Sequence, residues 1–322
     1  MRTTVVSIAM CTFNGEAFIE DQLNSILHQT HNNIEIVISD DQSSDRTVEI
    51  IKTYQKKDSR IKLYENKVNL GFLKNFEKVI SLCKGEYIAL ADQDDIWKEY
   101  KIEKFLKHIG KHILIYSDAL IIDKESKETG DELIRPHNVL CKGACNKSLL
   151  LYNVVSGNTM MFHKKLVPYI LPIHQNMTYH DSWIAFIAAT HSSITYTDEA
   201  MIYYRRYPEQ VTHTIKTKEH NIFRKIRIKM QKQITNAKLR EQELIAFKSV
   251  KLMQDKETLI LIETFILHFK KFKKIFFNYT LYKLLKKYLH EVFATLPNTK
   301  RNKMARRVSK GLKIHLYSLY LF

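Results

Sequence analysis

The sequence predicts an α/β protein with a mostly parallel sheet flanked by helices, followed by a basic helical region. Over residues 4–116, short apolar runs rich in β-branched residues alternate with segments whose apolar residues recur at helical spacing. This alternation is typical of parallel strands joined by right-handed crossovers. Beyond residue 216 the chain changes to helix-forming segments that mix lysine with aromatic residues.

The individual elements follow from these patterns. Strands are expected at 4–10, 34–38, 61–64, 87–90 and 113–116, and helices at 16–28, 45–54, 71–82 and 98–107. Residues 118–140 are polar and contain Gly130 and Pro136, which predicts a loop-rich connection. Residues 154–162 are expected to form a strand interrupted at Gly157, and short strands are expected at 194–196 and 201–204.

Charge divides the chain into two parts. The 322 residues carry a net charge of +17. Residues 216–322 hold 26 Lys and Arg against 7 Asp and Glu, whereas the rest of the chain holds 25 against 27. We therefore expect a first domain over residues 1–215 and a basic helical region over 216–322, with different physical roles.

Several classes of protein are disfavoured. Four cysteines in so long a chain do not make a disulfide framework, and Cys141-x3-Cys145 lacks the second pair that a zinc site needs. The eight glycines form neither G-x-G-x-x-G nor a P-loop, which argues against a nicotinamide dehydrogenase and a P-loop NTPase. No apolar run has the length of a signal peptide or a membrane span, so we expect a cytoplasmic protein.

An acidic stretch follows the strand expected at 87–90. Asp92, Asp94 and Asp95 crowd into four positions, where like charges repel unless a cation lies between them. Oxygen ligands of this kind suit Mg²⁺ or Mn²⁺, and the carboxyl ends of parallel strands are where ligands usually bind. The alternative is an acidic turn that caps the helix beginning near Trp97.

Two more strands end in polar turns on the same edge of the predicted sheet. The first strand leads to Thr12 and Asn14, in a turn that brings backbone amides to that edge. The second leads to Asp41, and an aspartate on such a turn can accept a hydrogen bond from a ring N–H of a base. Capping of the following helix is the alternative for the second turn. Three polar strand ends together favour a ligand site.

With these motifs in place, the chain resembles the family 2 glycosyltransferases with a GT-A fold. The resemblance covers roughly residues 4–215, and the Asp-Gln-Asp-Asp-x-Trp form at 92–97 is similar to bacterial rhamnosyltransferase-like members. It implies that Asp41 holds the base of a nucleotide-sugar donor and that Asp94 coordinates the metal bridging the donor diphosphate. It also implies that Asp92 contacts the ribose or the hydration shell of the metal, and we assign Thr12 and Asn14 to donor binding with them.

The same resemblance assigns the base of the reaction. Asp181, in the sequence Tyr-His-Asp-Ser-Trp, is similar to the aspartate that takes the proton of the acceptor hydroxyl in an inverting transfer. A helix N-cap is the alternative. His180 and Trp183 are candidate acceptor contacts, with a structural role for His180 left open. Gly157 and Thr159 match a Gly-x-Thr that family members often place near the sugar, although a plain bulge is equally consistent.

Arg205 and Arg206 are expected to bind the donor diphosphate. Relatives of the rhamnosyltransferase type tend to place Arg-Gln-His-x-x-Asn here, in a loop that closes over the phosphates. This chain keeps Arg205 but has Arg206-Tyr207 in place of Gln-His and Gln210 where Asn is common. A pair of arginines still neutralises phosphate.

The basic helices of residues 216–322 predict contact with an anionic membrane surface, at the inner face of the cell membrane. The alternative is a helical appendix whose lysines are merely solvated. Membrane contact suits a lipid-linked acceptor, and the expected donor is dTDP-rhamnose or a UDP-sugar. Nucleic-acid binding is disfavoured because no recognition motif accompanies the charge. A noncatalytic relative would be expected to lose Asp94 or Asp181, and both are present; the oligomeric state stays open.

Overall fold

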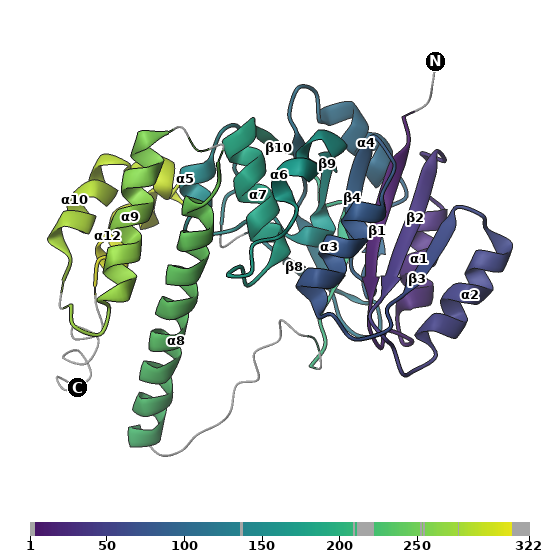
Figure 1. Cartoon of the computed structure of the whole chain (residues 1–322), viewed down its shortest axis with the longest axis horizontal. Coiled ribbons are helices and arrows are strands. Elements are labelled where there is room, and N and C mark those ends of the chain that lie inside the picture. Colours follow the sequence, from purple (N-terminus) through teal and green to yellow (C-terminus); the bar gives the residue numbers. More distant parts are fainter. Residues whose placement is uncertain are drawn as a thin grey trace. The chain divides into compact units, whose positions relative to one another are not determined.

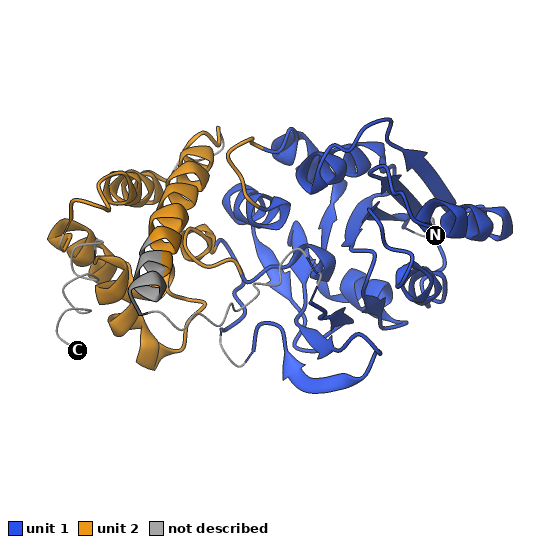
Figure 2. Ribbon diagram, turned by 90° about the horizontal axis from the view of Figure 1, so that it is seen from below, with its two compact units in different colours: residues 1–144, 154–173, 179–213 blue, residues 145–153, 174–178, 214–322 orange. Residues whose placement is uncertain are grey.

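The computed structural model describes residues 4–135, 138–208, 210, 222–251, 253, 255–275 and 277–310, with the backbone alone at 222–227, 229 and 230. The chain forms two compact units (Figure 2). Unit 1 comprises residues 1–144, 154–173 and 179–213, and unit 2 comprises residues 145–153, 174–178 and 214–322. Two short segments, 145–153 and 174–178, thus group with the C-terminal helices, although the sequence suggested a single boundary near residue 215.

Unit 1 is built on a seven-stranded sheet with the order β10-β6-β9-β4-β1-β2-β3 (Figure 1). Strand β1 pairs in parallel with both β2 and β4, whereas β9 runs antiparallel between β4 and β6. The sheet is therefore mostly parallel, as the alternating pattern predicted. Its strands are β1 (Val6–Thr12), β2 (Ile34–Asp40), β3 (Ile61–Glu65), β4 (Tyr87–Ala91), β6 (Leu114–Tyr116), β9 (Met160–His163) and β10 (Ile194–Tyr196).

Helices flank this sheet. Alternate residues of β1, Val6, Ile8 and Met10, lie in one buried apolar cluster with residues of α1, α2 and α4. This arrangement follows from the period-two alternation of side chains along a strand, which presents every second residue to the same layer of helices. The helices of unit 1 are α1 (Ile19–Leu27), α2 (Thr47–Lys57), α3 (Phe72–Leu82), α4 (Lys101–His108), α6 (Val167–Ile170) and α7 (His180–His191).

A second sheet of four strands, in the order β5-β11-β7-β8, carries part of the site. Its members are β5 (Ile96–Trp97), β11 (Ile202–Arg205), β7 (Ala119–Ile122) and β8 (Glu128–Glu132). The prediction of a loop-rich 118–140 was wrong for β7 and β8. The exposed β8 has no apolar alternation by which its sequence could be recognised as a strand, and it forms because it pairs with β7. The strand expected at 154–162 begins only at Met160, after the 3₁₀ turn η1 (Gly157–Thr159).

Unit 2 is helical. It contains α5 (Asn146–Leu149), α8 (Ile222–Lys248), α9 (Lys256–Lys270), α10 (Tyr279–Lys287), α11 (Leu289–Val292) and α12 (Asn298–Val308). Side-chain caps start two of these helices: Asp255 accepts from the N–H of Glu257, and Asn278 accepts from the N–H of Leu281. Within the ranges that the structure describes, no helix is both long and apolar enough to span a bilayer.

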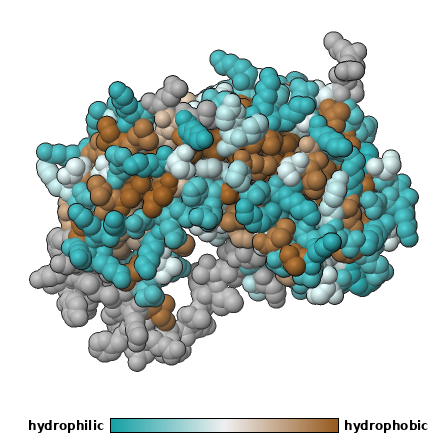
Figure 3. Space-filling view, in the orientation of Figure 1, coloured by the Kyte–Doolittle hydropathy of each residue, from teal (hydrophilic) through white to brown (hydrophobic). Residues whose placement is uncertain are grey.

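The described face drawn in Figure 3 is predominantly polar. In the view of Figure 3, hydrophilic residues cover most of the described face, and hydrophobic residues show between them in scattered areas. Such areas are normal for a folded chain, because polar side chains are too few to cover a surface completely. Exposed aromatic residues therefore matter only where several of them gather beside other functional groups.

Candidate active site

Three strand ends meet at one edge of the large sheet. In the parallel register, Thr12 at the end of β1 lies beside Asp40 at the end of β2, and Met10 lies beside Ala91, the last residue of β4. Electrostatics agrees with this placement: burial, and after it the charges of Asp92 and Asp41, raise the pKa of the Cys11 thiol. Asp41 and Asp92 thus lie on either side of β1, at the edge where the sequence predicted a ligand site.

Thr12 and Asn14 join the turns that follow β1 and β2. Thr12 is 2% exposed, and its hydroxyl donates to Asp40 Oδ2 over 2.8 Å. Asn14 has a left-handed backbone with φ 49°, and its side-chain oxygen accepts from the N–H of Ser44 at 2.8 Å. Both side chains therefore shape the edge through contacts with the second turn.

Asp41 holds the loop that leads into α3. The residue is 3% exposed. Its Oδ1 accepts from Asn66 Nδ2 and from the N–H of Leu70, and its Oδ2 accepts from the N–H of Gly71, each at 2.8 Å. A carboxylate oxygen can accept two hydrogen bonds, so Oδ2 retains the capacity for one further donor, such as the ring N–H of a base.

The acidic loop after β4 carries unfavourable charge. Burial, together with the charges of Asp94 and Asp181, raises the pKa of Asp92 to about 7. Asp95 is fully buried, and burial followed by its two acidic neighbours raises its pKa well above the ordinary value. Burial also raises the pKa of Asp94, although a hydrogen bond from Tyr207 opposes that shift. Carboxylates in this state are stabilised by a bound cation.

One cation of the protein itself reduces this repulsion from within. Lys101, in α4, is fully buried, and its Nζ donates to the carbonyl of Asn158 over 2.8 Å and lies 3.3 Å from the centroid of the Trp97 ring. Burial lowers the pKa of Lys101, while the negative charges of Asp95 and Asp92 oppose that shift. No sequence pattern singles out Lys101, because a lysine on a helix is usually solvated.

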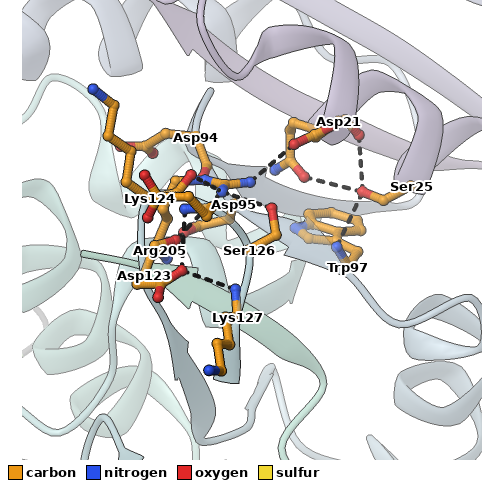
Figure 4. Close-up of polar contacts among 12 residues, drawn as sticks. Asp21, Ser25, Asp94, Asp95, Trp97, Asp123, Lys124, Ser126, Lys127 and Arg205 are labelled. Carbon is orange, nitrogen blue, oxygen red and sulfur yellow. Dashed lines mark hydrogen bonds and ion pairs between the residues drawn. The ribbon is translucent and has the colours of Figure 1, made fainter. Parts of the chain in front are cut away.

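Arg205 is a second buried cation, and it binds the protein itself (Figure 4). Its side chain is 1% exposed. Nε donates to the carbonyl of Asp94 at 2.9 Å, Nη1 to Ser126 Oγ at 2.8 Å, and Nη2 to Asp21 Oδ2 at 3.0 Å. Its backbone N–H donates to Asp95 Oδ1 at 3.1 Å. Each guanidinium nitrogen thus has a protein acceptor, whereas the sequence suggested a phosphate contact.

Arg206 is the exposed member of the pair. Its backbone N–H donates to the carbonyl of Ile122 at 2.9 Å, which continues the pairing of β11 with β7. Its guanidinium has no partner among the residues that the structure describes. Arg206 is therefore the arginine of the pair that stays available to a ligand.

Two side chains in the loop after β11 contact Asp94. The Tyr207 hydroxyl donates to Asp94 Oδ2 at 2.7 Å, and its ring lies 4.9 Å from that of Phe18. Gln210 Nε2 lies 3.5 Å from the same oxygen. In the sequence, both residues stand out only as departures from a family pattern. Their positions two and five residues after Arg205 were the one signal of a role.

The start of α7 brings Asp181 to the same edge. Asp181 lies in the first turn of the helix, where its Oδ1 accepts from the N–H of Ser182, and its charge contributes to the raised pKa of Asp92. Trp183 points into the core: it is 5% exposed, and its Nε1 donates to the carbonyl of Ile170 at 2.8 Å. The acceptor contact expected for Trp183 is not available in this arrangement.

His180 is buried beside these groups. Its ring stacks on Phe76 with centroids 3.8 Å apart, and burial lowers its pKa to about 3. Neither ring nitrogen has a hydrogen-bond partner within the described part of the chain. A Cβ added at Gly157 would lie 2.6 Å from His180 Nε2, so only glycine leaves room for this ring. Thr159 is fully buried and donates to the carbonyl of Ser156 at 2.8 Å, which stabilises the turn at Gly157.

The donor set fits a divalent cation that is shared with a ligand. Over the described residues, no group of three His, Cys, Asp or Glu side chains forms a complete metal site. Mg²⁺ and its analogues, however, are usually held by one or two carboxylates, with water and substrate phosphates completing the shell. Asp94 and Asp92 supply hard oxygen ligands of that kind, and their raised pKa values indicate that positive charge is favoured there.

Comparisons with known proteins agree with this geometry. The chain is 35% identical over 169 residues to an uncharacterized glycosyltransferase of Haemophilus influenzae, covering 49% of this chain and 51% of that protein. It is 35% identical over 124 residues to WfgD of Escherichia coli, a UDP-Glc:α-D-GlcNAc-diphosphoundecaprenol β-1,3-glucosyltransferase, covering 38% of this chain and 48% of WfgD. The chain thus spans about half the length of the curated relatives that it matches.

The fold is also shared with solved structures. The structure of residues 1–349 of TarS from S. aureus in complex with UDP superposes with a TM-score of 0.60 at 16% identity, over 98% of this chain and 91% of that one. The model of the family described as glycosyl transferase family 2 matches residues 7–168, which include the three strand ends and the acidic loop. The chain belongs to glycosyl transferase family 2 and has its GT-A fold.

Proposed function

We propose that the chain is an inverting, metal-dependent glycosyltransferase that moves a sugar from a nucleotide-sugar donor to a hydroxyl of a surface polysaccharide precursor. One observation carries the proposal. Asp92 is affected by the charges of both Asp94, beside it in the loop after β4, and Asp181, which comes from a distant part of the chain, so the three carboxylates lie within electrostatic reach of Asp92. Carboxylates brought together in this way are typical of a site that binds a metal–diphosphate group and removes a proton.

In this proposal, the donor binds across the strand ends. Asp41 accepts the ring N–H of the base through Oδ2, and Thr12 and Asn14 shape the turn beneath it. Asp94, with Asp92, would hold Mg²⁺ or Mn²⁺, which when bound would neutralise the charge of the leaving diphosphate. Arg206 supplies the arginine contact to phosphate, and Arg205 positions Asp94 and Asp95 in place of the direct contact that the sequence suggested.

Asp181 acts as the general base. Its carboxylate takes the proton of the acceptor hydroxyl while that oxygen forms a bond to C1 of the donor sugar. The bond between C1 and the phosphate oxygen breaks, and the nucleoside diphosphate leaves on the opposite face, so the configuration at C1 inverts. One carboxylate is sufficient because the leaving group needs no proton when its charge is neutralised.

A UDP-sugar or dTDP-rhamnose is the proposed donor. The name of WfgD specifies UDP-Glc and a diphosphoundecaprenol acceptor, and the TarS structure of similar fold contains UDP, which supports a UDP-sugar and a lipid-linked acceptor for this chain. His180 precedes Asp181, the proposed general base, and Gly157 lies against the His180 ring, so both residues lie near the point where the acceptor hydroxyl must arrive.

Residues 216–322 are proposed to hold the chain at the inner, anionic surface of the cell membrane, with residues 1–215 as the catalytic domain. On α12, four basic side chains are exposed: Lys300, Lys303, Arg306 and Arg307. Each basic group near an anionic leaflet contributes about 1 kcal/mol of attraction. The full chain should sediment with anionic vesicles and much less with neutral ones.

Charge reversal tests the surface involved. Glu at Lys303, Arg306 and Arg307 should abolish sedimentation with anionic vesicles, whereas Glu at the exposed Lys56 and Lys57 of α2 should not. Equal sedimentation of both variants would remove the proposed role of α12.

A ligand screen followed by two substitutions tests the catalytic proposal. Purified protein is first screened for thermal stabilisation by UDP-glucose, UDP-N-acetylglucosamine and dTDP-rhamnose, with and without Mn²⁺, to identify the donor used to assay the variants. Asp94→Ala should abolish transfer and weaken metal-dependent donor binding, whereas Asp181→Asn should abolish transfer and leave donor binding intact. Asp198→Asn, at an aspartate whose side chain is 92% exposed, is the matched control. Turnover retained by Asp181→Asn would refute the assignment of the base.

A further inference from the structure

Two exposed aromatic rings lie side by side at the start of α3 and α7. Phe72, the first residue of α3, and Tyr179, the residue preceding α7, are each 42% exposed. Their ring centroids are 6.0 Å apart, with an angle of 37° between the planes. We call Phe72 and Tyr179 the aromatic pair. Exposed apolar rings cost free energy in water, so a pair of them is a candidate contact surface.

Buried rings hold the aromatic pair in place. Phe72 meets His180 edge-on at 6.4 Å, and His180 stacks on the buried Phe76 at 3.8 Å. Gly157 lies against the Nε2 edge of the same ring. Because the inner rings are fixed by packing, the outer two are presented in a defined position and lose little freedom when a ligand binds.

Each ring of the aromatic pair is close along the chain to one group of the proposed reaction. Tyr179 is two residues before Asp181, the proposed base, in the segment that opens α7. Phe72 follows Gly71, whose N–H donates to Asp41, the carboxylate proposed to bind the nucleobase of the donor. The acceptor must place its hydroxyl at Asp181 from outside the donor, so its sugar ring has to lie near that end of α7.

We infer that the aromatic pair is the acceptor subsite, and that it stacks against the C–H face of a pyranose ring; its designation as an acceptor site rests on the proposed function. A pyranose has electropositive C–H bonds on one face and hydroxyls around its rim. The negative faces of aromatic rings attract the C–H bonds. The carboxylate of Asp181 accepts a hydrogen bond from a hydroxyl of the rim. A purely apolar ligand would gain from the rings but would leave Asp181 desolvated beside it, which is unfavourable.

Saturation-transfer NMR tests the subsite without any donor. The full chain is titrated with methyl β-D-glucopyranoside and with methyl N-acetyl-β-D-glucosaminide. Saturation should pass to C–H protons of one pyranose face. The double variant Phe72→Ala/Tyr179→Ala should weaken binding about tenfold, which corresponds to about 1.4 kcal/mol, because it removes both stacking rings.

The chain offers a matched control. Tyr169, also 42% exposed, lies 4.3 Å from His191 at the opposite end of α7, so Tyr169→Ala removes an equally exposed ring and should leave glycoside binding unchanged. If the double variant fails to fold, Tyr179→Leu decides, because it keeps apolar volume at an exposed position and removes the aromatic face.

Two results would overturn the inference: no saturation transfer to either glycoside, or equal transfer in the wild type and in the Tyr179 and Phe72 variants. The proposed function fails by a different measurement, because it requires stabilisation by a sugar nucleotide. A chain that binds glycosides at the aromatic pair but no sugar nucleotide would keep the subsite and refute the transferase.

Discussion

Replacement of Arg205 separates a positioning role from a phosphate contact. Arg205→Ala removes the hydrogen bonds to Asp94, Ser126 and Asp21. It also removes a positive charge from beside the buried Asp94 and Asp95, because the Arg205 side chain is only 1% exposed. Breaking a buried charge network from one side costs about 3–5 kcal/mol. We expect a loss of this size in the free energy of unfolding, before any ligand is added.

Urea unfolding followed by circular dichroism measures this effect. Arg205→Lys should recover only part of the stability, because an ammonium keeps the charge but cannot reproduce the planar fork of donors. Arg206→Ala is the matched control: its side chain is exposed and has no partner among the described residues, so stability should change by less than about 0.5 kcal/mol. Donor affinity, measured by calorimetry with a UDP-sugar and Mn²⁺, should fall in Arg206→Ala.

The opposite pattern would refute this reasoning. If Arg205→Ala unfolds at the wild-type urea concentration and loses only donor affinity, then its guanidinium contacts the ligand and not the protein. The hydrogen bonds at 2.8–3.0 Å would then have to be exchanged for phosphate oxygens when the donor binds.

Three further substitutions test other parts of the site and its surroundings. Gly157→Ala should cost about 1–3 kcal/mol of stability and lower transfer, because its Cβ would lie 2.6 Å from His180 Nε2. Urea unfolding measures the loss, Gly157→Ala combined with His180→Ala should cost less than the sum of the two single variants, and a neutral Gly157→Ala would contradict the packing. Lys101→Met should lower the free energy of unfolding by about 3 kcal/mol, because it removes the positive charge beside the buried carboxylate of Asp95. Lys107→Met, at an exposed position of the same helix, should not, and equal urea midpoints for Lys101→Met and the wild type would show that Lys101 is dispensable. Burial lowers the pKa of His268 to about 4, so its contribution to stability is complete above the unfolded value of about 6.5 and is lost as the pH falls from there to about 4, by about 3 kcal/mol in total. His268→Gln should flatten this part of the pH profile of unfolding, and parallel profiles for the two proteins would exclude it.

The sequence predicted the parts of the fold that depend on local periodicity. The strands and helices up to residue 116 carry regular apolar patterns, and parallel strands necessarily bring their carboxyl ends to one edge. The meeting of Asp41, Asp92 and Asp94 at that edge could therefore be foreseen. The polar strand β8 could not, because its pairing with β7 depends on a tertiary contact and not on its own composition.

The burial of Arg205 was hidden for the same reason. An arginine in a family motif for phosphate is expected at the surface, and its acceptors come from Asp21, Asp94 and the turn at 123–126, which no local pattern connects with it. The surroundings of His180 could not be predicted from the sequence either. Its neighbour Asp181 could be assigned by resemblance, whereas the stacking on Phe76 that fixes both residues depends on how α3 packs beside α7.

The triple anchoring of Asp41 affects how its mutants are to be interpreted. Truncation of this carboxylate would remove the contact proposed for the nucleobase, and it would also release the segment from Asn66 to Gly71, which Phe72 follows directly. Loss of turnover in such a mutant would therefore combine a defect at the proposed donor site with a displacement of the aromatic pair. Asn66→Ala removes a single anchor and spares the carboxylate, so a comparison of Michaelis constants for the two mutants resolves one defect from the other.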